Sequence, residues 1–529
     1  MKLKAALLVI SSSVLLSIPW LVPHCGWIAL FALVPLLFLE DSAHRKQIKH
    51  FFLLQYSAFL LWNAFTTFWV SNATIGGGIF AVTANALFSA LIFQIFHISR
   101  RFLKRSAPYM LLVALWIAWE KLYFNVQISW PWLTLGYAFA QSTELVQWYE
   151  YLGSLGGSLW VLLSNIFIYK TLEAFLEKQA QRKKTLLFSS SALLIICPLI
   201  CSVIIYRNYK EPEEGTVKVV IGQPNFDPYE KFTSMSQGEQ DAVLLGLFRS
   251  AQVSGPALYI APETFTGAYV IDDYRNNRTW KAFYDFLKNG HPDSYLLFGA
   301  SAYKYFPGSK APSVLARKIG NEIWAESYNS AIMLDSSART QIFHKSKLVV
   351  GVELTPLPQV FCKIDDIFGG VMGRCVAQPE ISLLDYGDVP VGCAICYESV
   401  YGDYCRGYVL KGAKLMTVIT NDAWWGNTPG YRQHLSYSCL RAIELRREIA
   451  RCGNTGISAI IDSRGNITKR SEWWKREVLT GEVRLSSRET FFVREGDMVG
   501  RVCSFTAVLL LLILAVTVIR KSPMSGAGK

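Results

Sequence analysis

Three polar residues between positions 263 and 396 each directly follow a short run that we expect to form a buried strand, and their side chains suit covalent chemistry. The runs and the residues that follow them are 257–262 with Glu263, 340–344 with Lys345, and 391–395 with Cys396. Polar residues placed directly after buried strands are held rigidly at the edge of a sheet, where α/β folds build their sites. We therefore expect Glu263, Lys345 and Cys396 to meet at such an edge.

Together the three groups are those that acyl transfer through a thiol requires. A carboxylate can take the thiol proton and later the proton of an attacking amine. A nearby cation lowers the thiol pKa and stabilises the oxyanion of the tetrahedral intermediate. The thioester that results keeps enough transfer potential for a second nucleophile.

Each residue also has a structural interpretation when it is taken alone. A cysteine at a strand end is commonly a buried apolar filler, and a lone glutamate or lysine at a strand end is commonly on the surface. Lys347 competes with Lys345 as the cation, because residues two apart on a strand face the same side. Only the combination of the three groups favours catalysis.

The other cysteines leave two alternatives open. Cys393 and Cys396 form a C-x-x-C pair, but this pair closes an apolar strand, whereas the redox motif opens a helix, so packing is the favoured role of Cys393. Cys362 and Cys375 would be able to form a disulfide in an oxidising compartment, which the sequence alone does not decide.

The composition shows what kind of chain carries these residues. Of 529 residues, 51% are hydrophobic and the mean hydropathy is +0.25, which is too apolar for an ordinary soluble enzyme. The formal charge of +13 would suit nucleic acid, but a basic excess also arises where Lys and Arg flank membrane spans. The positions of the charges favour a membrane protein and no nucleic-acid partner.

Eight apolar runs are candidate membrane spans, although the second, fifth and sixth are short. They cover residues 5–21, 26–39, 51–70, 78–98, 107–119, 156–169, 186–206 and 503–519. Lys and Arg gather between spans two and three, four and five, and six and seven, and beside both termini, while two of the alternate loops, residues 24–25 and 71–77, have none. The positive-inside rule then places both termini in the cytoplasm and the segment between spans seven and eight outside.

The N-terminal run also resembles a signal peptide that precedes Cys25. The residues before Cys25 are Val22, Pro23 and His24, which are not the small residues of a cleavage site. Loss of this run would also spoil the alternation of charge, so we expect it to remain as the first span.

The chain therefore divides into a transmembrane domain of residues 1–206, a soluble domain of 207–501, and a last span with its tail, 502–529. Short β-branched or apolar runs between polar turns predict strands in the soluble domain. They cover residues 217–221, 257–260, 295–300, 330–334, 389–396, 415–420 and 457–461. Apolar residues at three- and four-residue steps predict a helix over 431–452, so the domain is expected to be α/β.

Three motifs of the soluble domain resemble the signatures of the nitrilase, or carbon-nitrogen hydrolase, superfamily and occur in the family order. They are Pro262-Glu263-Thr264, the stretch from His344-Lys345 to Glu353 and Pro356, and Cys396-Tyr397-Glu398. The resemblance implies an αββα sandwich. It also implies that Glu263 is the base, Lys345 the oxyanion cation and Cys396 the nucleophile.

The chain is more closely similar to the apolipoprotein N-acyltransferase family, because the nitrilase-like domain is inserted before the last of about eight spans. Further similar segments are 420–426, 433–434, 441–444 and 454–456, and, in the membrane part, 119–120, 130–133 and 136–137. The spacing from Lys345 to Glu353 matches the family, so Glu353 is expected to orient Lys345 or assist proton transfer. Tyr397 and Glu398 are expected to shape the turn that carries Cys396.

The sequence departs from the family at two places. Ala261 stands where many members have Trp, and the segment 223–232 lacks a Trp that is often found a little further on. Tyr229 or Phe232 is a candidate replacement in the acyl pocket. The pairs Trp424-Trp425 and Trp473-Trp474 are candidates to cover the site or anchor it to a membrane, with core packing as the alternative.

The resemblance implies transfer of a fatty acyl group from a phospholipid, by a thioester, to the N-terminal amine of a diacylglyceryl-cysteine lipoprotein. It implies neither a metal nor a diffusible cofactor. It places a monomeric enzyme in the bacterial cytoplasmic (inner) membrane, with the catalytic domain on the periplasmic, extracytoplasmic side. The alternatives are a membrane-tethered amidase that sends water to the thioester, and a non-enzymatic scaffold or transporter that does not depend on Cys396.

Overall fold

The computed structural model describes residues 2–231, 233–367 and 372–521. The chain forms two compact units. The first contains Met1–Val126, Trp130–Tyr209 and Glu495–Lys529, and the second contains Gln127–Ser129 and Lys210–Arg494. Each unit is described below by itself.

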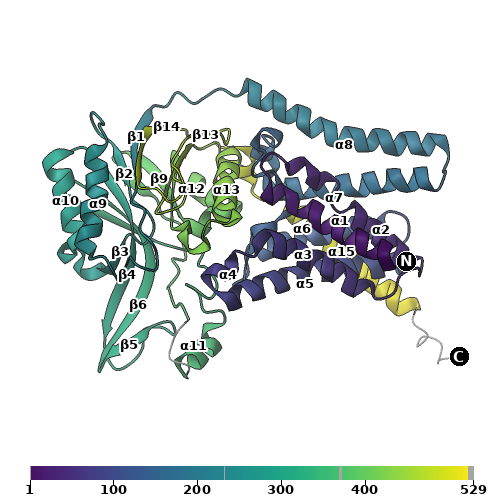
Figure 1. Ribbon diagram of the computed structural model, residues 1–529, viewed down its shortest axis with the longest axis horizontal. Coiled ribbons are helices and arrows are strands. Elements are labelled where there is room, and N and C mark those ends of the chain that lie inside the picture. Colours follow the sequence, from purple (N-terminus) through teal and green to yellow (C-terminus); the bar gives the residue numbers. More distant parts are fainter. Residues whose placement is uncertain (1, 232, 368–371, 522–529) are drawn as a thin grey trace. The chain divides into compact units, whose positions relative to one another are not determined.

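The first unit is a bundle of helices (Figure 1). Its long helices are α1 (Lys2–Leu21), α2 (Val34–His44), α3 (Phe51–Thr67), α5 (Ile75–Phe102), α6 (Ala107–Tyr123), α7 (Tyr149–Leu176), α8 (Gln181–Asn208) and α15 (Met498–Lys521). Short helical segments join them: η1 (Gly26–Leu30), α4 (Val70–Ala73), η2 (Pro131–Leu133), η3 (Leu135–Phe139) and η4 (Thr143–Leu145). The unit is helical because the runs are apolar and only a helix satisfies its own backbone polar groups in lipid.

Six segments of this unit are long and apolar enough to cross a membrane. They are Leu3–Leu21, Gly26–His44, Ile75–Phe102, Tyr149–Leu176, Gln181–Asn208 and Met498–Lys521. Helices α3 and α6 have 17 residues each, about 26 Å at 1.5 Å per residue, so they fall just short of a hydrocarbon core about 30 Å thick. All eight apolar runs of the sequence lie on helical segments, and the short sixth run belongs to the 28-residue helix α7.

The second unit contains two β-sheets. An eight-stranded sheet has the order β14-β1-β2-β4-β6-β5, with β3 paired to β4 and β7 to β6, and a six-stranded sheet has the order β13-β12-β11-β10-β9-β8. The strands of the first sheet are β1 (Thr216–Gln223), β2 (Leu258–Ile260), β3 (Thr266–Val270), β4 (Tyr295–Pro307), β5 (Arg317–Gly320), β6 (Ile323–Asp335), β7 (Thr340–His344) and β14 (Glu477–Arg484). Those of the second are β8 (Leu384–Tyr386), β9 (Val389–Ile395), β10 (Leu415–Thr420), β11 (Ile449–Gly453), β12 (Ala459–Ile461) and β13 (Ile467–Arg470).

Helices cover the two sheets to give four layers. Helices α9 (Gln237–Ser250) and α10 (Arg278–Gly290) lie side by side over one face of the first sheet, as Figure 1 shows. The alternation along β1 explains the layers, because Val220 packs under α9 while Val219 and Ile221 face the core shared with the second sheet. Helices α12 (Gly402–Leu410) and α13 (Pro429–Leu445) pack on the second sheet. The expected αββα sandwich is therefore confirmed.

Parallel pairing aligns the strand ends that position the site. Strand β2 pairs in parallel with β1 and β4, and β10 pairs in parallel with β9 and β11. Side chains that follow β2, β9 and β10 are thus presented at carboxyl ends of parallel strands, where α/β folds place ligands.

The helix predicted over 431–452 is wrong at its C-terminal end. Helix α13 stops at Leu445 because Arg446 adopts a left-handed conformation with φ of 47°, and Ile449 begins strand β11. Ile449 and Cys452 are buried in strand β11, and their spacing continues the apolar period of the helix, so the pattern did not distinguish a helix from a strand.

Candidate active site

The structure brings Glu263 and Lys345 into direct contact. Glu263 follows β2 and Lys345 follows β7, and the Nζ atom of Lys345 lies 3.1 Å from Oε1 of Glu263. Both side chains are buried, with 6% and 1% of their surface exposed. A carboxylate and an ammonium paired away from water interact far more strongly than a surface pair.

Glu353 completes a carboxylate pair around the ammonium. Lys345 Nζ lies 3.0 Å from Oε1 and 2.9 Å from Oε2 of Glu353, whose Oε2 also accepts the backbone N–H of Val349 at 2.8 Å. One cation therefore faces two acids, and the expected contact between Glu353 and Lys345 is present in the structure.

Asn329 of β6 bridges the two acids and was not identified from the sequence. Its Nδ2 donates to Glu263 Oε1 at 2.8 Å and to Glu353 Oε1 at 2.6 Å. Its backbone carbonyl oxygen accepts the backbone N–H of Lys345 at 2.8 Å. The only signal in the sequence was that an asparagine directly precedes the predicted strand 330–334. An asparagine at such a position is too common to indicate a functional residue.

The charges of the cluster shift the pKa values of Lys345 and Cys396. Burial alone would lower the pKa of Lys345, but Glu263 and then Glu353 outweigh it and hold this pKa well above its usual value. Burial, reinforced by Glu263, raises the pKa of Cys396 well above that of a free thiol, although Lys345 acts in the opposite direction. At rest the sulfur is therefore a thiol that needs a base to remove its proton.

Cys396 occupies a strained turn at the end of β9. It is the first residue of the short helix η6 (Cys396–Val400), and its φ is 53°, a region that L-residues rarely adopt. A strained backbone conformation persists only where the surrounding contacts hold it in place. Such residues are concentrated at functional sites. The residue as a whole is partly buried.

Glu398 fixes this turn against the segment that carries Lys345. Its Oε2 accepts the N–H of Ile395 at 2.9 Å, and its Oε1 accepts the N–H of Ser346 at 2.6 Å and the hydroxyl of Tyr404 at 2.9 Å. Burial raises the pKa of Glu398 to about 7, even though these donors favour the charged form. The geometry gives Glu398 a positioning contact with both segments.

A second buried network lies behind Cys396. Nε2 of His434 lies 3.0 Å from the carbonyl oxygen of Cys396, and Nδ1 lies 2.8 Å from Oδ1 of Asp422. Arg451 donates to Oδ2 of Asp422 at 2.6 Å, and all three polar side chains are fully buried. His434 and Asp422 belong to segments that resemble the family, but their support of the Cys396 turn was not predicted.

The potential metal ligands Cys396, Asp422 and His434 lie within 4.8 Å of one another. The guanidinium of Arg451 lies 2.6 Å from Asp422 and 3.1 Å from Nδ1 of His434. This fixed positive charge opposes a second cation, and the carboxylate and imidazole already have hydrogen-bond partners. The group therefore does not fit a metal ion.

Lys347 does not share the environment of Lys345. Strand β7 ends at His344. Side chains alternate between two faces only along a strand, so this alternation does not relate Lys345 to Lys347. Its Nζ lies 5.2 Å from the ring centroid of Tyr401 and 6.0 Å from that of Tyr404. The prediction that both lysines would face the same side is wrong because the strand is too short.

Another lysine, Lys231, lies close to Glu263 and was missed. Only 2% of its surface is exposed, and its Nζ donates a short hydrogen bond to the carbonyl oxygen of Thr264. Thr264 has a φ of 46°, so this bond holds the turn directly after Glu263. Burial, opposed by the charge of Glu263, lowers the pKa of Lys231 to about 7.

The remaining cysteines form no disulfide among the residues that the structure describes. All eleven cysteines lie in the described part of the chain and are free thiols, including Cys362 and Cys375. Cys393 is buried in β9, and burial raises its pKa to about 12. Its packing role agrees with its position inside a strand.

The aromatic residues near these segments divide into packed and exposed groups. Tyr397 is buried and donates its hydroxyl to the carbonyl oxygen of Ser129 at 3.0 Å. Trp425 and Trp473 pack against His434 and Tyr431, respectively, whereas Trp424 and Trp474 are 38% and 43% exposed. Tyr229 is exposed and meets Trp424 edge to face, with ring centroids 5.2 Å apart; Phe232 lies outside the described residues.

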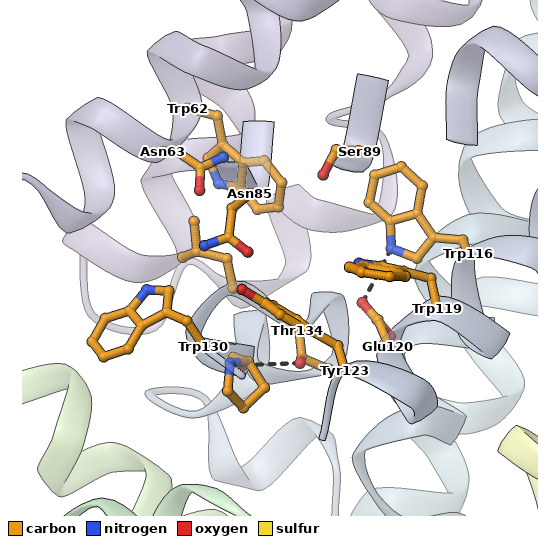
Figure 2. Close-up of a pocket in the computed structure, with 12 residues that line it drawn as sticks. Trp62, Asn63, Asn85, Ser89, Trp116, Trp119, Glu120, Tyr123, Trp130 and Thr134 are labelled. Atoms are coloured by element: carbon orange, nitrogen blue, oxygen red, sulfur yellow. Dashed lines mark hydrogen bonds between the residues drawn. The ribbon is translucent and has the colours of Figure 1, made fainter. Parts of the chain in front are cut away.

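The helical unit carries a separate pocket of about 40 Å³ that is lined by both aromatic and polar side chains (Figure 2). Glu120 of α6 accepts the indole N–H of Trp116 at 3.1 Å and the backbone N–H of Leu135 at 2.8 Å on the same oxygen. The carboxylate therefore ties α6 to the segment that follows Trp130. The pocket contains none of the predicted catalytic residues.

Two family models match the chain. Residues 12–167 match the apolipoprotein N-acyltransferase N-terminal domain, and residues 258–491 match carbon-nitrogen hydrolase. Among solved structures, a nitrilase-superfamily protein of Saccharomyces cerevisiae is 14% identical, with a TM-score of 0.35, and covers 55% of this chain and 98% of its own. Fold and site together define a membrane-embedded acyltransferase built on a carbon-nitrogen hydrolase domain.

Similar whole chains define the family more narrowly. The apolipoprotein N-acyltransferase of Chlorobaculum tepidum is 30% identical over 94% of this chain and 93% of its own. That of Geobacter metallireducens is 28% identical over 94% of this chain and 92% of its own. This chain belongs to the apolipoprotein N-acyltransferase family.

Proposed function

We propose that the chain transfers a fatty acyl group from a phospholipid to the N-terminal amine of a diacylglyceryl-cysteine lipoprotein, with Cys396 as the nucleophile. The observation that carries the proposal is the cluster of Glu263, Lys345 and Glu353 beside the strained turn of Cys396. The names of the similar chains support the choice of acceptor.

In the first half-reaction Glu263 removes the proton of the Cys396 thiol. The thiolate attacks the ester carbonyl of the phospholipid, and the ammonium of Lys345 stabilises the oxyanion. The carbon–oxygen bond of the ester breaks, the leaving alkoxide takes the proton from Glu263, and a lysophospholipid departs. The acyl group remains as a thioester on Cys396.

In the second half-reaction the α-amine of the lipoprotein attacks the thioester. Glu263 takes a proton from the amine, the carbon–sulfur bond breaks, and the Cys396 sulfur is protonated again. Glu353 positions Lys345 through both steps, because it contacts the ammonium. Asn329 positions Glu263, because it donates to Glu263 and to Glu353. The products of the cycle are an amide and the regenerated thiol.

The location of the enzyme follows from the charges around the helices. The positive-inside rule supports an orientation in the cytoplasmic membrane with the catalytic unit on the periplasmic side, and we take the enzyme to be a monomer. One face of that unit suits a lipid surface, because large apolar side chains on and beside α11 (Pro358–Ile367) are exposed. They are Leu357, Val360, Phe361, Ile364 and Ile367, with 41–80% of their surface exposed.

The direct test is mass spectrometry of the purified enzyme after incubation with a phospholipid. We expect a fatty acyl adduct on Cys396, and its release when a diacylated lipopeptide is added. The variant Cys396→Ala should form neither adduct nor N-acylated product, whereas Cys393→Ala should retain both. Hydrolysis of amides without acyl transfer would favour the amidase alternative, and unchanged function of Cys396→Ala would contradict any thioester.

A further inference from the structure

A cavity of about 610 Å³ lies within the helical unit, among α6, α7, α8 and α15. This volume would hold about 20 groups of the size of a water molecule, since each takes up about 30 Å³. None of its lining residues is a predicted catalytic residue. Helix α8 is the peripheral wall, since only 11% of its most apolar window is buried in the protein.

The walls of this cavity are mostly apolar. Each of the four helices contributes, and the wall includes Val113, Leu163, Ile166, Phe167, Leu187 and Cys503. Walls of this kind offer water few hydrogen-bond partners, so at membrane depth a hydrocarbon chain is the ligand that suits this space.

One end of the cavity is positively charged. Arg105 directly precedes α6, Lys170 lies near the end of α7, and Lys183 lies near the start of α8. These helix ends share one face of the unit, because the chain crosses it along α7 and returns along α8. The arrangement places three cations around one rim of an apolar space.

The charges at this rim are only partly neutralised. Lys170 pairs with Glu173 at 2.8 Å and lies over the ring of Tyr109, 4.6 Å from its centroid. Arg105 and Lys183 are exposed, and neither forms an ion pair with any residue that the structure describes. At least two positive charges therefore remain available to a ligand.

We propose that this cavity binds one phospholipid with an anionic headgroup. One acyl chain fills the apolar space between α8 and helices α6 and α15. The headgroup lies at the rim, where Arg105, Lys170 and Lys183 face its phosphate. Basic pockets between membrane helices bind anionic lipids in this way, and the ligand stabilises the loosely packed helix α8.

The test is a thermal-unfolding titration of the delipidated full-length enzyme in mixed micelles. Phosphatidylglycerol should raise the unfolding temperature by several degrees at saturation, while phosphatidylcholine should raise it much less. Inorganic phosphate should have no effect, because it has no acyl chain. Equal stabilisation by the two lipids, or full stabilisation by phosphate, would overturn the proposal.

Charge variants locate the binding site. Each cation near a membrane surface contributes about 1 kcal/mol, so Arg105→Gln with Lys183→Gln should weaken the apparent affinity for phosphatidylglycerol about 30-fold. Lys104→Gln with Lys178→Gln removes the same charge from residues that do not line the cavity, and should change the affinity little. Equal effects of the two pairs would show non-specific attraction and refute the site.

A cavity-filling variant tests the acyl chain. Leu163→Trp adds volume where the chain would lie, so native mass spectrometry should detect less bound phosphatidylglycerol than in the unaltered enzyme. If the variant unfolds, the charge variants still decide the matter. Undiminished lipid binding by a folded Leu163→Trp enzyme would contradict occupation of this cavity.

Discussion

At the scale of single residues, the site depends on acceptors that are shared by several donors. Glu398 is the clearest case, because its two oxygens accept N–H groups from the segment after Lys345 and from the end of β9. Glutamine has one acceptor oxygen and would point an N–H₂ group at some of these donors. A buried donor without a partner costs about 1–3 kcal/mol.

Glu398→Gln should therefore lower both stability and turnover. We expect a loss of about 1–3 kcal/mol in the free energy of unfolding, and a fall in kcat that exceeds any change in KM for the lipopeptide. Glu398→Asp, which keeps the charge, should recover part of kcat. Glu380→Gln, at an exposed glutamate, is the matched control, and a Glu398→Gln enzyme with normal kcat would exclude the positioning role.

Lys231 predicts a pH effect on stability. Its pKa is lowered to about 7 in the folded chain, whereas an unfolded lysine titrates near 10.5. Between these values the unfolded chain binds more protons, so stability rises with pH across this window, by at most about 1.4 kcal/mol per pH unit. Below pH 7 the cost of burying the ammonium is fully present.

Lys231→Met should remove this contribution. Unfolding temperatures measured from pH 7 to pH 10 should rise more steeply for the unaltered enzyme than for the variant. Lys288→Met, at an exposed lysine of α10, should follow the unaltered enzyme. Parallel profiles for Lys231→Met and the unaltered enzyme would show that burial does not lower the pKa of Lys231.

At the scale of elements, close packing of two strands positions Glu263. A Cβ atom on Gly299 of β4 would lie 2.5 Å from both Cα of Glu263 and the backbone nitrogen of Thr264. Backbone atoms cannot move aside as a flexible side chain would, so the turn that holds Glu263, the proposed base, must shift.

Gly299→Ala should lower turnover by about 100-fold, because misplacement of a catalytic group by about 1 Å costs that much. Gly246→Ala in α9 is the matched control, since its added Cβ meets nothing within 4 Å. That control should keep full activity and gain up to about 1 kcal/mol of stability from helix propensity. Acylation of Cys396 measured in a single turnover would show the contrast, and equal rates would contradict it.

The sequence predicted those strands that are buried and consist of continuous apolar runs. All seven predicted strands coincide with strands of the sandwich, and the ends of the strands before Glu263, Lys345 and Cys396 were located. The helix over 431–452 failed because the apolar period of a buried helix continues into the buried strand β11. Asn329 and Lys231 were not identified from the sequence, because their roles depend on hydrogen bonds between segments far apart in the chain.

At the scale of the whole molecule, the charges flanking the helices predict which side of the membrane each loop faces. Arg and Lys gather in the loops at residues 45–49, 100–105 and 178–184, and these loops should be cytoplasmic. The segment between α8 and α15, which contains the candidate site, should then be outside.

Cysteine labelling of intact cells without an outer membrane tests this topology. A membrane-impermeant maleimide should label Ser309→Cys, in an exposed turn of the catalytic unit, before the cells are permeabilised. It should label Lys178→Cys, in the loop between α7 and α8, only afterwards, with the unaltered chain as the background because it already contains exposed thiols. The reverse pattern would place the catalytic unit in the cytoplasm, where secreted lipoproteins would not reach Cys396 after export, and the proposed acceptor would have to be abandoned.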